Sequence, residues 1–91
     1  MANLQSAKKR MRQNIKRREH NRRYRSAART YIRRSRELIA AGRFDEAEEA
    51  VRMAASTLDK AARKGVIHPN NAARRKSRIM SQLAEAQKEA A

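Results

Sequence analysis

Arginine and lysine are the residues whose number and spacing could do chemistry in this chain. Six arginines repeat at intervals of four, three, four, four and three residues, so on a helix they share one face. This arginine row consists of Arg18, Arg22, Arg25, Arg29, Arg33 and Arg36. A guanidinium group donates two parallel N–H bonds to a phosphate and is weakly hydrated. The row, about 27 Å long at ~1.5 Å per residue, predicts a surface that binds nucleic-acid phosphates.

Further basic residues lie alongside this row and in a second cluster near the carboxyl end. A second row on the same helix contains Lys9, Arg12, Lys16, Arg23 and Arg34. In the carboxyl cluster, Arg74, Arg75 and Arg78 share a helix face opposite apolar residues, close to the helix amino terminus, where anions bind favourably. Lys76 falls nearer the apolar side, where its stem can cover the core edge while its ammonium group reaches solvent.

The net charge of +15 is distributed unevenly along the chain. Residues 1–36 contain fourteen of the 24 basic residues and one of the nine acids. A solvated helix face normally mixes signs so that residues four apart can pair, but the arginine row has only Glu19 and Glu37 near it. Self-repulsion on this scale favours a polyanionic partner. We predict nucleic acid, and an anionic membrane surface is its main rival.

Residue patterns typical of enzymes and metal sites are missing from the sequence. There is no cysteine, no Gly-rich phosphate loop and no nucleophile–base pair, and no acid stands at coordination spacing from His68. We therefore expect no catalytic residue, no metal, no cofactor and no small-molecule substrate. No apolar run approaches the ~20 residues of a membrane span, and no apolar signal segment is present, so we expect a cytoplasmic protein without a membrane partner.

Helix breakers divide the chain into three predicted helices. The first runs from about Ser6, a plausible N-cap, to Ala41, and Gly42 ends it. The second begins at Asp45 with a variant of the capping box, and Gly65 follows its end at residues 63–64. The third begins at Pro69, with His68 as a possible cap, and continues to about residue 88. The first helix, about 54 Å long, must project beyond its bundle.

Apolar stripes on the three helices can bury one another. On the first helix the stripe is Tyr24, Ala28, Tyr31, Ser35 and Leu38, with Ile32 and Ile39 beside it. On the second it is Phe44, Ala47, Val51, Ala54, Leu58 and Ala61, and on the third Ala72, Ala73, Ile79, Met80 and Leu83. The predicted fold class is therefore all-α, a three-helix bundle with a long first helix projecting beyond the bundle. We divide the single domain, 1–91, into an extended basic arm, 1–23, and the bundle, 24–88.

The amino half of the first helix differs from its carboxyl half. Leu4, Met11 and Ile15 lie on the side of the arginine row, so a straight helix cannot bring them into the bundle core. Contact with the partner, exposure and a local bend are all open explanations for these three residues. Without a partner, repulsion between basic residues favours disorder in this half.

The three aromatic residues indicate which kind of nucleic acid is bound. Tyr24, Tyr31 and Phe44 all fall on core stripes, whereas proteins that bind single strands usually expose aromatic side chains for base stacking. Phosphate and sugar contacts on a structured, helical nucleic acid are therefore favoured. Composition alone leaves a nucleoid-type DNA-binding protein as an alternative.

Three segments resemble one protein family, in order and over nearly the whole chain. They are residues 1–10 (MANLQSAKKR), residues 25–32 (RSAARTYI) and residues 59–68 (DKAARKGVIH), the last followed by Asn70 and residues 72–78 (AARRKSR). The chain resembles the bacterial small-subunit ribosomal protein S-twenty family. This chain differs from the family at two positions: Pro69 stands where the family often has lysine, and Leu4 stands where isoleucine is commoner.

The resemblance implies a non-enzymatic part of the small ribosomal subunit, a three-helix bundle with an extended first helix. The partner that it implies is 16S ribosomal RNA, bound early in assembly at the base of the subunit body; no homo-oligomer is expected. Positions that match the family imply RNA contacts at Lys8, Lys9, Arg10, Arg25, Arg29, Arg74, Lys76 and Arg78. Other basic residues of the first helix and of the carboxyl cluster add eight members to the predicted RNA-binding set: Arg12, Lys16, Arg17, Arg18, Arg22, Arg33, Arg36 and Arg75.

Overall fold

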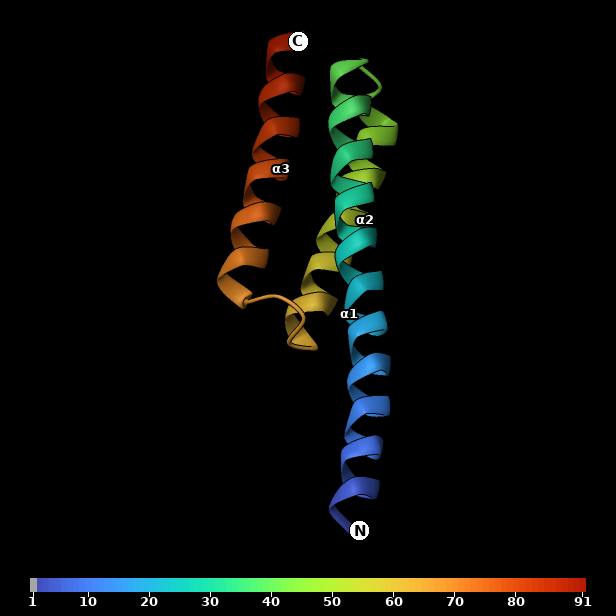
Figure 1. Cartoon of the computed structure of the whole chain (residues 1–91). Helices are drawn as coiled ribbons and strands as arrows, with labels where there is room; N and C mark the ends of the chain where they lie inside the picture. Colours follow the sequence, from blue (N-terminus) through green and yellow to red (C-terminus); the bar gives the residue numbers. More distant parts are fainter. Residues whose placement is uncertain (1) are drawn as a thin grey trace.

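Residues 2–91 form three α-helices joined by two short turns (Figure 1). The structure is a computed structural model that describes the backbone of residues 2–91 and the side chains from Leu4 onward. Helix α1 spans Ala2–Ala40, α2 spans Phe44–Arg63 and α3 spans Pro69–Ala90. No strand occurs among the described residues, and the predicted all-α class is confirmed. Met1, the first residue of the predicted arm, lies outside the described residues.

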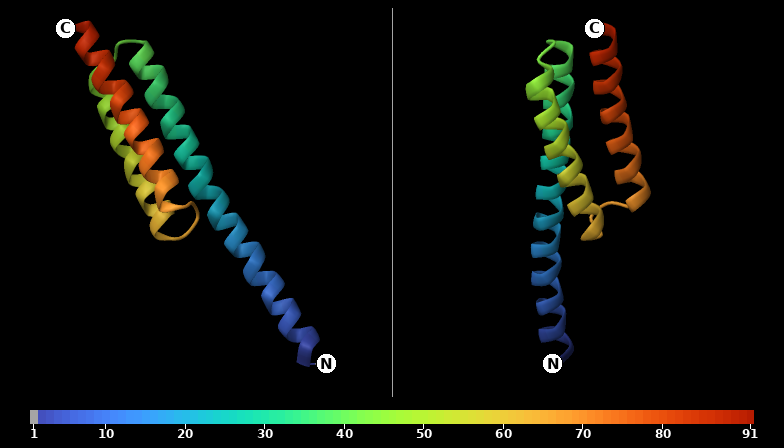
Figure 2. Two further views of the ribbon diagram at one scale, coloured as in Figure 1. Left: turned by 90° about the vertical axis from the view of Figure 1, so that its left-hand side faces the viewer. Right: turned by 180° about the vertical axis from the view of Figure 1, so that it is seen from behind.

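The helices form an open bundle rather than a closed one. Helix α2 runs antiparallel to α1, and α3 turns back to run in the direction of α1 (Figures 1 and 2). Both α1 and α3 pack extensively on α2, whereas α3 makes little contact with α1 and leans away from it (Figure 2, right). One side of the bundle therefore leaves the flanks of α1 and α3 facing each other across a gap in the packing.

Helix α1 projects well beyond the other two helices, as predicted. Every described side chain from Leu4 to His20 is exposed, partial burial begins at Asn21, and the first buried residue is Ala28. At ~1.5 Å per residue, α1 is about 58 Å long and α2 about 30 Å. The molecule measures 69 × 21 × 13 Å. We keep residues 1–23 as the arm and 24–88 as the bundle, a division that remains our proposal.

The core has two parts, which Ile32 of α1 joins because it packs against both. One part contains Ala47, Val51, Ile79 and Leu83, and the other contains Ala28, Leu58 and Ala72. The predicted stripes of α1 and α2 are confirmed, with the aromatic residues half-buried. Ser35 is fully buried within the α1 stripe, where its Oγ donates a hydrogen bond of 2.7 Å to the carbonyl of Tyr31.

The predicted stripe of α3 was too wide, and two core residues were missed. Ala73 is exposed and Met80 is 50% exposed, because α3 packs mainly on α2 and presents a narrow contact face. Residues one position beyond that face are turned about 100° away from it. Ala50 and Val66, which did not belong to any predicted stripe, are buried.

Both glycines end helices in the way that the sequence predicts. Gly42 and Gly65 each have φ +75°, a left-handed conformation that side chains with a Cβ rarely adopt. The Gly65 N–H donates to the carbonyl of Ala62 (3.1 Å), and the Val66 N–H donates to the carbonyl of Ala61 (2.9 Å). The same pair of bonds follows α1 at Gly42. These two turns satisfy the last carbonyl groups of α1 and α2 and set the direction of the next helix.

The helix starts agree with the sequence in one case and differ in two. At α3, Pro69 occupies the first turn and His68 Nδ1 accepts the Asn70 N–H at 3.1 Å, as predicted. Ser6 lies inside α1, which begins at Ala2, so it is not the N-cap. Helix α2 begins one residue before Asp45, and its cap residue, Arg43, makes no side-chain capping bond. The first-turn residues Asp45 and Glu46 are exposed, so solvent can accept hydrogen bonds from the N–H groups that a side-chain cap would otherwise bind.

Leu58 is the side chain whose truncation should cost the bundle most. It is fully buried between α1 and α3 and is one of the largest side chains in the core. We expect Leu58→Ala to lower the free energy of unfolding by about 2–5 kcal/mol, because the alanine leaves a cavity. Urea unfolding followed by circular dichroism measures this change. Met53→Ala on the same helix, where the side chain is 44% exposed, should change stability little, and equal losses would contradict the assigned core.

Candidate nucleic-acid interface

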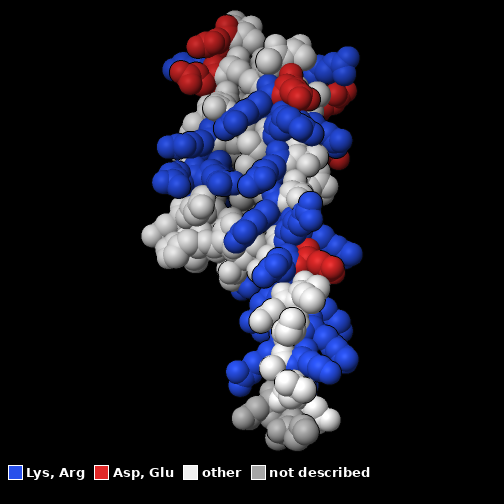
Figure 3. Space-filling view, viewed as in Figure 1, with Lys and Arg blue, Asp and Glu red and all other residues white. Residues whose placement is uncertain are grey.

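The arginine row lies on the flank of α1 that faces α3. Three of its members and two arginines of α3 line one hollow of about 400 Å³ between the helices, which we call the arginine hollow. Its basic residues are Arg29, Arg33, Arg36, Arg75 and Arg78. In Figure 3, basic side chains from α1 and from the first turns of α3 gather on this side of the molecule. The structure thus brings together two clusters that are about forty residues apart in the sequence.

The packing of the bundle creates this hollow. Ile32 lies in its lining and packs against both core clusters, so it fixes the rotation of α1 about its axis. The neighbouring arginines on α1 are then held toward α3 at the spacing of successive turns. On α3, burial of Ile79 turns Arg75 and Arg78 toward α1. Because α3 leans away from α1, the guanidinium groups stay exposed instead of being covered by the opposite helix.

The arginines of the hollow lack acidic partners. Among residues 2–91, the ion pairs join Arg43 with Glu46 (3.6 Å) and Lys76 with Asp59 (3.3 Å), so none of the five arginines is paired. Glu37 is the one acid in the described lining. Like charges held this close repel one another, and each guanidinium keeps N–H donors available. An anion with several acceptor oxygens, such as the backbone of a nucleic acid, would relieve the repulsion and satisfy the donors.

Arg25 has a structural contact in addition to its predicted role. Its Nη2 donates a hydrogen bond of 3.2 Å to the carbonyl of Val66, which connects α1 to the turn between α2 and α3. The sequence did not indicate this bond, since it joins residues 41 positions apart. Arg25, Arg29 and Arg75 also line a second hollow beside His68, immediately below the first. The basic surface therefore continues from the arginine hollow to the amino terminus of α3.

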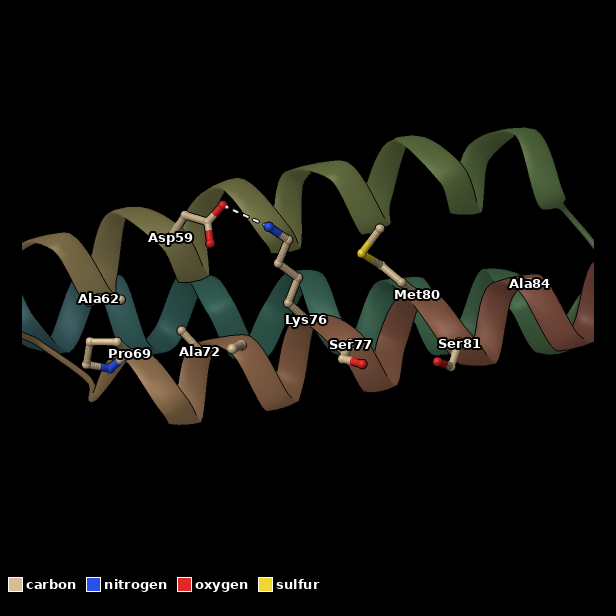
Figure 4. A pocket seen from close by; sticks show the side chains of 10 residues that line it. Asp59, Ala62, Pro69, Ala72, Lys76, Ser77, Met80, Ser81 and Ala84 are labelled. Carbon is tan, nitrogen blue, oxygen red and sulfur yellow. Dashed lines mark hydrogen bonds and ion pairs between the residues drawn. The ribbon is translucent and has the colours of Figure 1, made fainter.

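Lys76 lies apart from the other basic residues of α3. Its Nζ is 3.3 Å from Asp59 Oδ2 on α2, and the pair borders a shallow groove on the far flank of α3 (Figure 4). Lys76 is half-buried, in agreement with a stem that covers the edge of the core. Arg74 is exposed and outside the lining of the arginine hollow. RNA contacts by Lys76 and Arg74 remain predictions that the hollow does not support directly.

The arm carries the remaining predicted contacts, and all of them are exposed. They are Lys8, Lys9, Arg10, Arg12, Lys16, Arg17, Arg18 and Arg22. No other helix packs beside the arm (Figure 1), so these side chains surround the helix instead of converging on one site. Arg18 and Arg22 continue the line of the arginine hollow onto the arm.

The second basic row is not continuous with the arginine row. Arg23 borders a hollow with Met53 and Lys60, and Arg34 borders one with Glu46 and Glu49. Both hollows lie on the α2 side of α1, so the two rows occupy opposite flanks of the helix. The expectation that they lie side by side was wrong, because at about 100° per residue the two rows are turned roughly 130° from each other around the helix.

Acidic residues gather at the end of the bundle farthest from the arm (Figure 3). Asp45 and Glu46 stand in the first turn of α2, and Glu85 and Glu89 stand in the last turns of α3. Glu48 accepts a 2.8 Å hydrogen bond from Gln87 Nε2, which ties these two helix ends together. The charge is therefore polarised along the longest dimension of the molecule, with the basic arm at the opposite end.

Two kinds of feature are absent from the part of the chain that the structure describes. No helix within residues 2–91 is long and apolar enough to cross a membrane. In the same range, no three His, Cys, Asp or Glu side chains are close enough to hold a metal ion. The basic surface is thus the prominent candidate site in the described structure.

Comparison with known proteins gives consistent matches. Residues 2–84 match the model of a family described as ribosomal protein S20. The chain is 52% identical to the small ribosomal subunit protein bS20 of Acinetobacter baylyi over 83 residues, which cover 91% of this chain and 93% of the relative. The protein of the same name from Acinetobacter baumannii strain AYE is 51% identical, with 91% and 94% covered. That of Thermomicrobium roseum is 50% identical, with 91% and 84% covered.

Proposed function

The chain belongs to the ribosomal protein S20 family, and from that premise we propose that it binds 16S ribosomal RNA through phosphate contacts. The relatives are named as proteins of the small ribosomal subunit, and the family is a structural, non-enzymatic component of it. In our proposal the protein holds phosphates of several RNA helices at once and stabilises their arrangement during assembly. Its expected location is the cytoplasm, on the ribosome.

The observation that carries the proposal is the arginine hollow. Arginines from α1 and α3 face each other without acidic partners. The phosphates of a backbone lying between the helices would therefore accept hydrogen bonds from guanidinium groups on both sides. Arginine suits this contact better than lysine because its planar guanidinium group forms paired bonds to phosphate oxygens. Tyr24, Tyr31 and Phe44 are half-buried, so no Tyr or Phe ring among the described residues is fully exposed as a platform. This supports phosphate contact over base stacking.

The exposed basic arm supports contact with more than one RNA segment. It extends away from the hollow on the same continuous helix and presents cations around its circumference. A helix with basic residues on several faces can neutralise phosphates from RNA strands on different sides of it. The arm and the hollow would then bridge RNA helices that repel each other in the absence of protein.

Competition between RNA and DNA tests the proposal against the alternative of a nucleoid-type DNA-binding protein. Labelled 16S ribosomal RNA is bound to the protein at fixed ionic strength and challenged with unlabelled 16S RNA or with duplex DNA of equal phosphate concentration. We expect DNA to compete much less effectively, because the spacing of phosphates across A-form grooves differs from that in B-form DNA. Equal competition by the two polymers would contradict the proposal and favour general DNA binding.

A further inference from the structure

Three apolar side chains on the arm are exposed although they are large. Leu4 is 61% exposed, Met11 62% and Ile15 53%, and no part of the bundle reaches them. Single exposed apolar residues are common on protein surfaces. These three are aligned, since intervals of seven and four residues return to the same helix face. They form an apolar strip about 16 Å long at ~1.5 Å per residue.

The apolar strip is in register with the arginine row. Leu4, Met11 and Ile15 each precede a member of that row by eighteen residues, namely Arg22, Arg29 and Arg33. Eighteen residues make five full turns of a helix with 3.6 residues per turn, so each pair points in the same direction. Uncharged atoms run along the arm on the side where basic side chains gather higher up (Figure 3). One continuous face of α1 therefore changes from cationic to apolar as it leaves the bundle.

Basic residues border the strip, and they restrict what can cover it. At about 100° per residue, Lys8, Arg12 and Lys16 lie on one flank of the strip. Arg10 and Arg18 lie on its other flank, and all five side chains are exposed. A partner must therefore offer apolar atoms that lie between rows of negative charge. RNA does so in its wide, shallow minor groove, where riboses and base edges lie between two phosphate backbones. The deep major groove of RNA admits side chains poorly.

We infer that Leu4, Met11 and Ile15 form an apolar contact for ribose and base-edge atoms in the minor groove of an RNA helix, while the basic residues beside them bind its phosphates. This inference rests on the proposed binding of 16S RNA and specifies what its arm contacts. In the proposed function, the arginine hollow contacts only the RNA backbone. The strip adds a contact to riboses and base edges inside the groove, which contacts to phosphates alone do not make.

The test compares three variants in binding to full-length 16S ribosomal RNA over a range of salt concentrations. The first is the triple substitution Leu4→Gln, Met11→Gln and Ile15→Gln, which keeps the charge and the helix propensity of the arm. The second, Met53→Gln with Met80→Gln, removes side chains of similar exposure (44% and 50%) outside this face. The third, Leu4→Met, Met11→Leu and Ile15→Leu, keeps the strip apolar.

We expect the glutamine triple variant to bind about tenfold to a hundredfold more weakly, because it loses the burial of apolar surface against RNA. The loss is limited to this range because part of each side chain is already covered before binding. The slope of log K against log salt should not change, because no cation is lost. The other two variants should bind like the unsubstituted protein. Equal affinity of the triple variant would overturn the inference, as would a weaker salt slope, which would indicate lost phosphate contacts instead.

A vesicle experiment tests whether the strip contacts RNA or a lipid surface. Vesicles of phosphatidylcholine and phosphatidylglycerol are tested for co-flotation with the same variants. Loss of vesicle binding in the triple variant, with full retention of RNA affinity, would overturn the inference in favour of a lipid contact. Failure of the unsubstituted protein to bind 16S RNA would refute the proposed function itself, so the two failures can be told apart.

Discussion

Reversal of two charges across the arginine hollow, Arg29→Glu with Arg75→Glu, is expected to weaken binding to 16S RNA by roughly 10²–10⁴-fold. These two residues line both hollows and come from different helices. Each charge-assisted contact to a phosphate contributes about 1.5–3 kcal/mol, and each glutamate adds repulsion. Equilibrium binding at fixed salt measures the loss. Both side chains are exposed, so the thermal unfolding of the variant should stay close to that of the parent protein.

A matched reversal outside the hollow separates local contact from net charge. Arg43→Glu with Arg52→Glu changes the net charge by the same amount, at exposed positions on the turn before α2 and on α2 itself. We expect its affinity to fall less than about tenfold, because only long-range attraction is reduced and salt screens it over ~10 Å. Similar losses in both double variants would mean that net charge, and not the hollow, determines binding.

Salt should have an effect of similar size on the unsubstituted protein. If about ten phosphates are neutralised, affinity for 16S RNA is expected to fall roughly 10³–10⁵-fold between 50 and 200 mM salt, because bound cations displace counterions from the RNA. Filter binding or fluorescence anisotropy across that range gives the slope directly.

The double reversal across the hollow provides an internal check on the salt experiment. Loss of two phosphate contacts should make the slope of log K against log salt shallower by about 1.4–1.8. A flat salt response of the parent protein would contradict the phosphate contacts altogether. An unchanged slope in the Arg29 and Arg75 variant would show that these arginines bind something other than phosphate.

Local signals in the sequence were sufficient for the helices and for most of the core. Gly42, Gly65 and Pro69 mark helix ends through backbone conformations that depend on the residue itself. The stripes on α1 and α2 follow the helical period, and both are confirmed. Ser6 failed as a signal because a serine can sit inside a helix as well as cap one, and nothing nearby distinguished the two.

Features that depend on how the three helices pack against one another could not be predicted from the spacing of apolar and basic residues. The hollow exists because α3 packs mainly on α2 and only slightly on α1, and no local pattern encodes this preference. Met80 and Lys76 border the groove on the other flank of α3, where Lys76 pairs with Asp59, away from the arginines. The Arg25 contact with Val66 also needs the folded bundle, because it joins α1 to a distant turn. Residue types predicted a nucleic-acid partner, whereas the tertiary arrangement brings the arginines of α1 and α3 together.

The continuity of α1 from bundle to arm has a consequence for how the arm forms a helix. Starting a helix is the unfavourable step, with an equilibrium constant on the order of 10⁻³, whereas each added residue is nearly neutral. The packed half of α1 removes that step, because it serves as a nucleus from which the helix can propagate toward the amino terminus. If repulsion unwinds the arm in the absence of RNA, rewinding from residue 23 needs propagation only. Because the helix is continuous, the packed half fixes the direction in which each side chain of the new turns points. Every cation of the arm therefore takes a defined orientation relative to the arginines of the bundle.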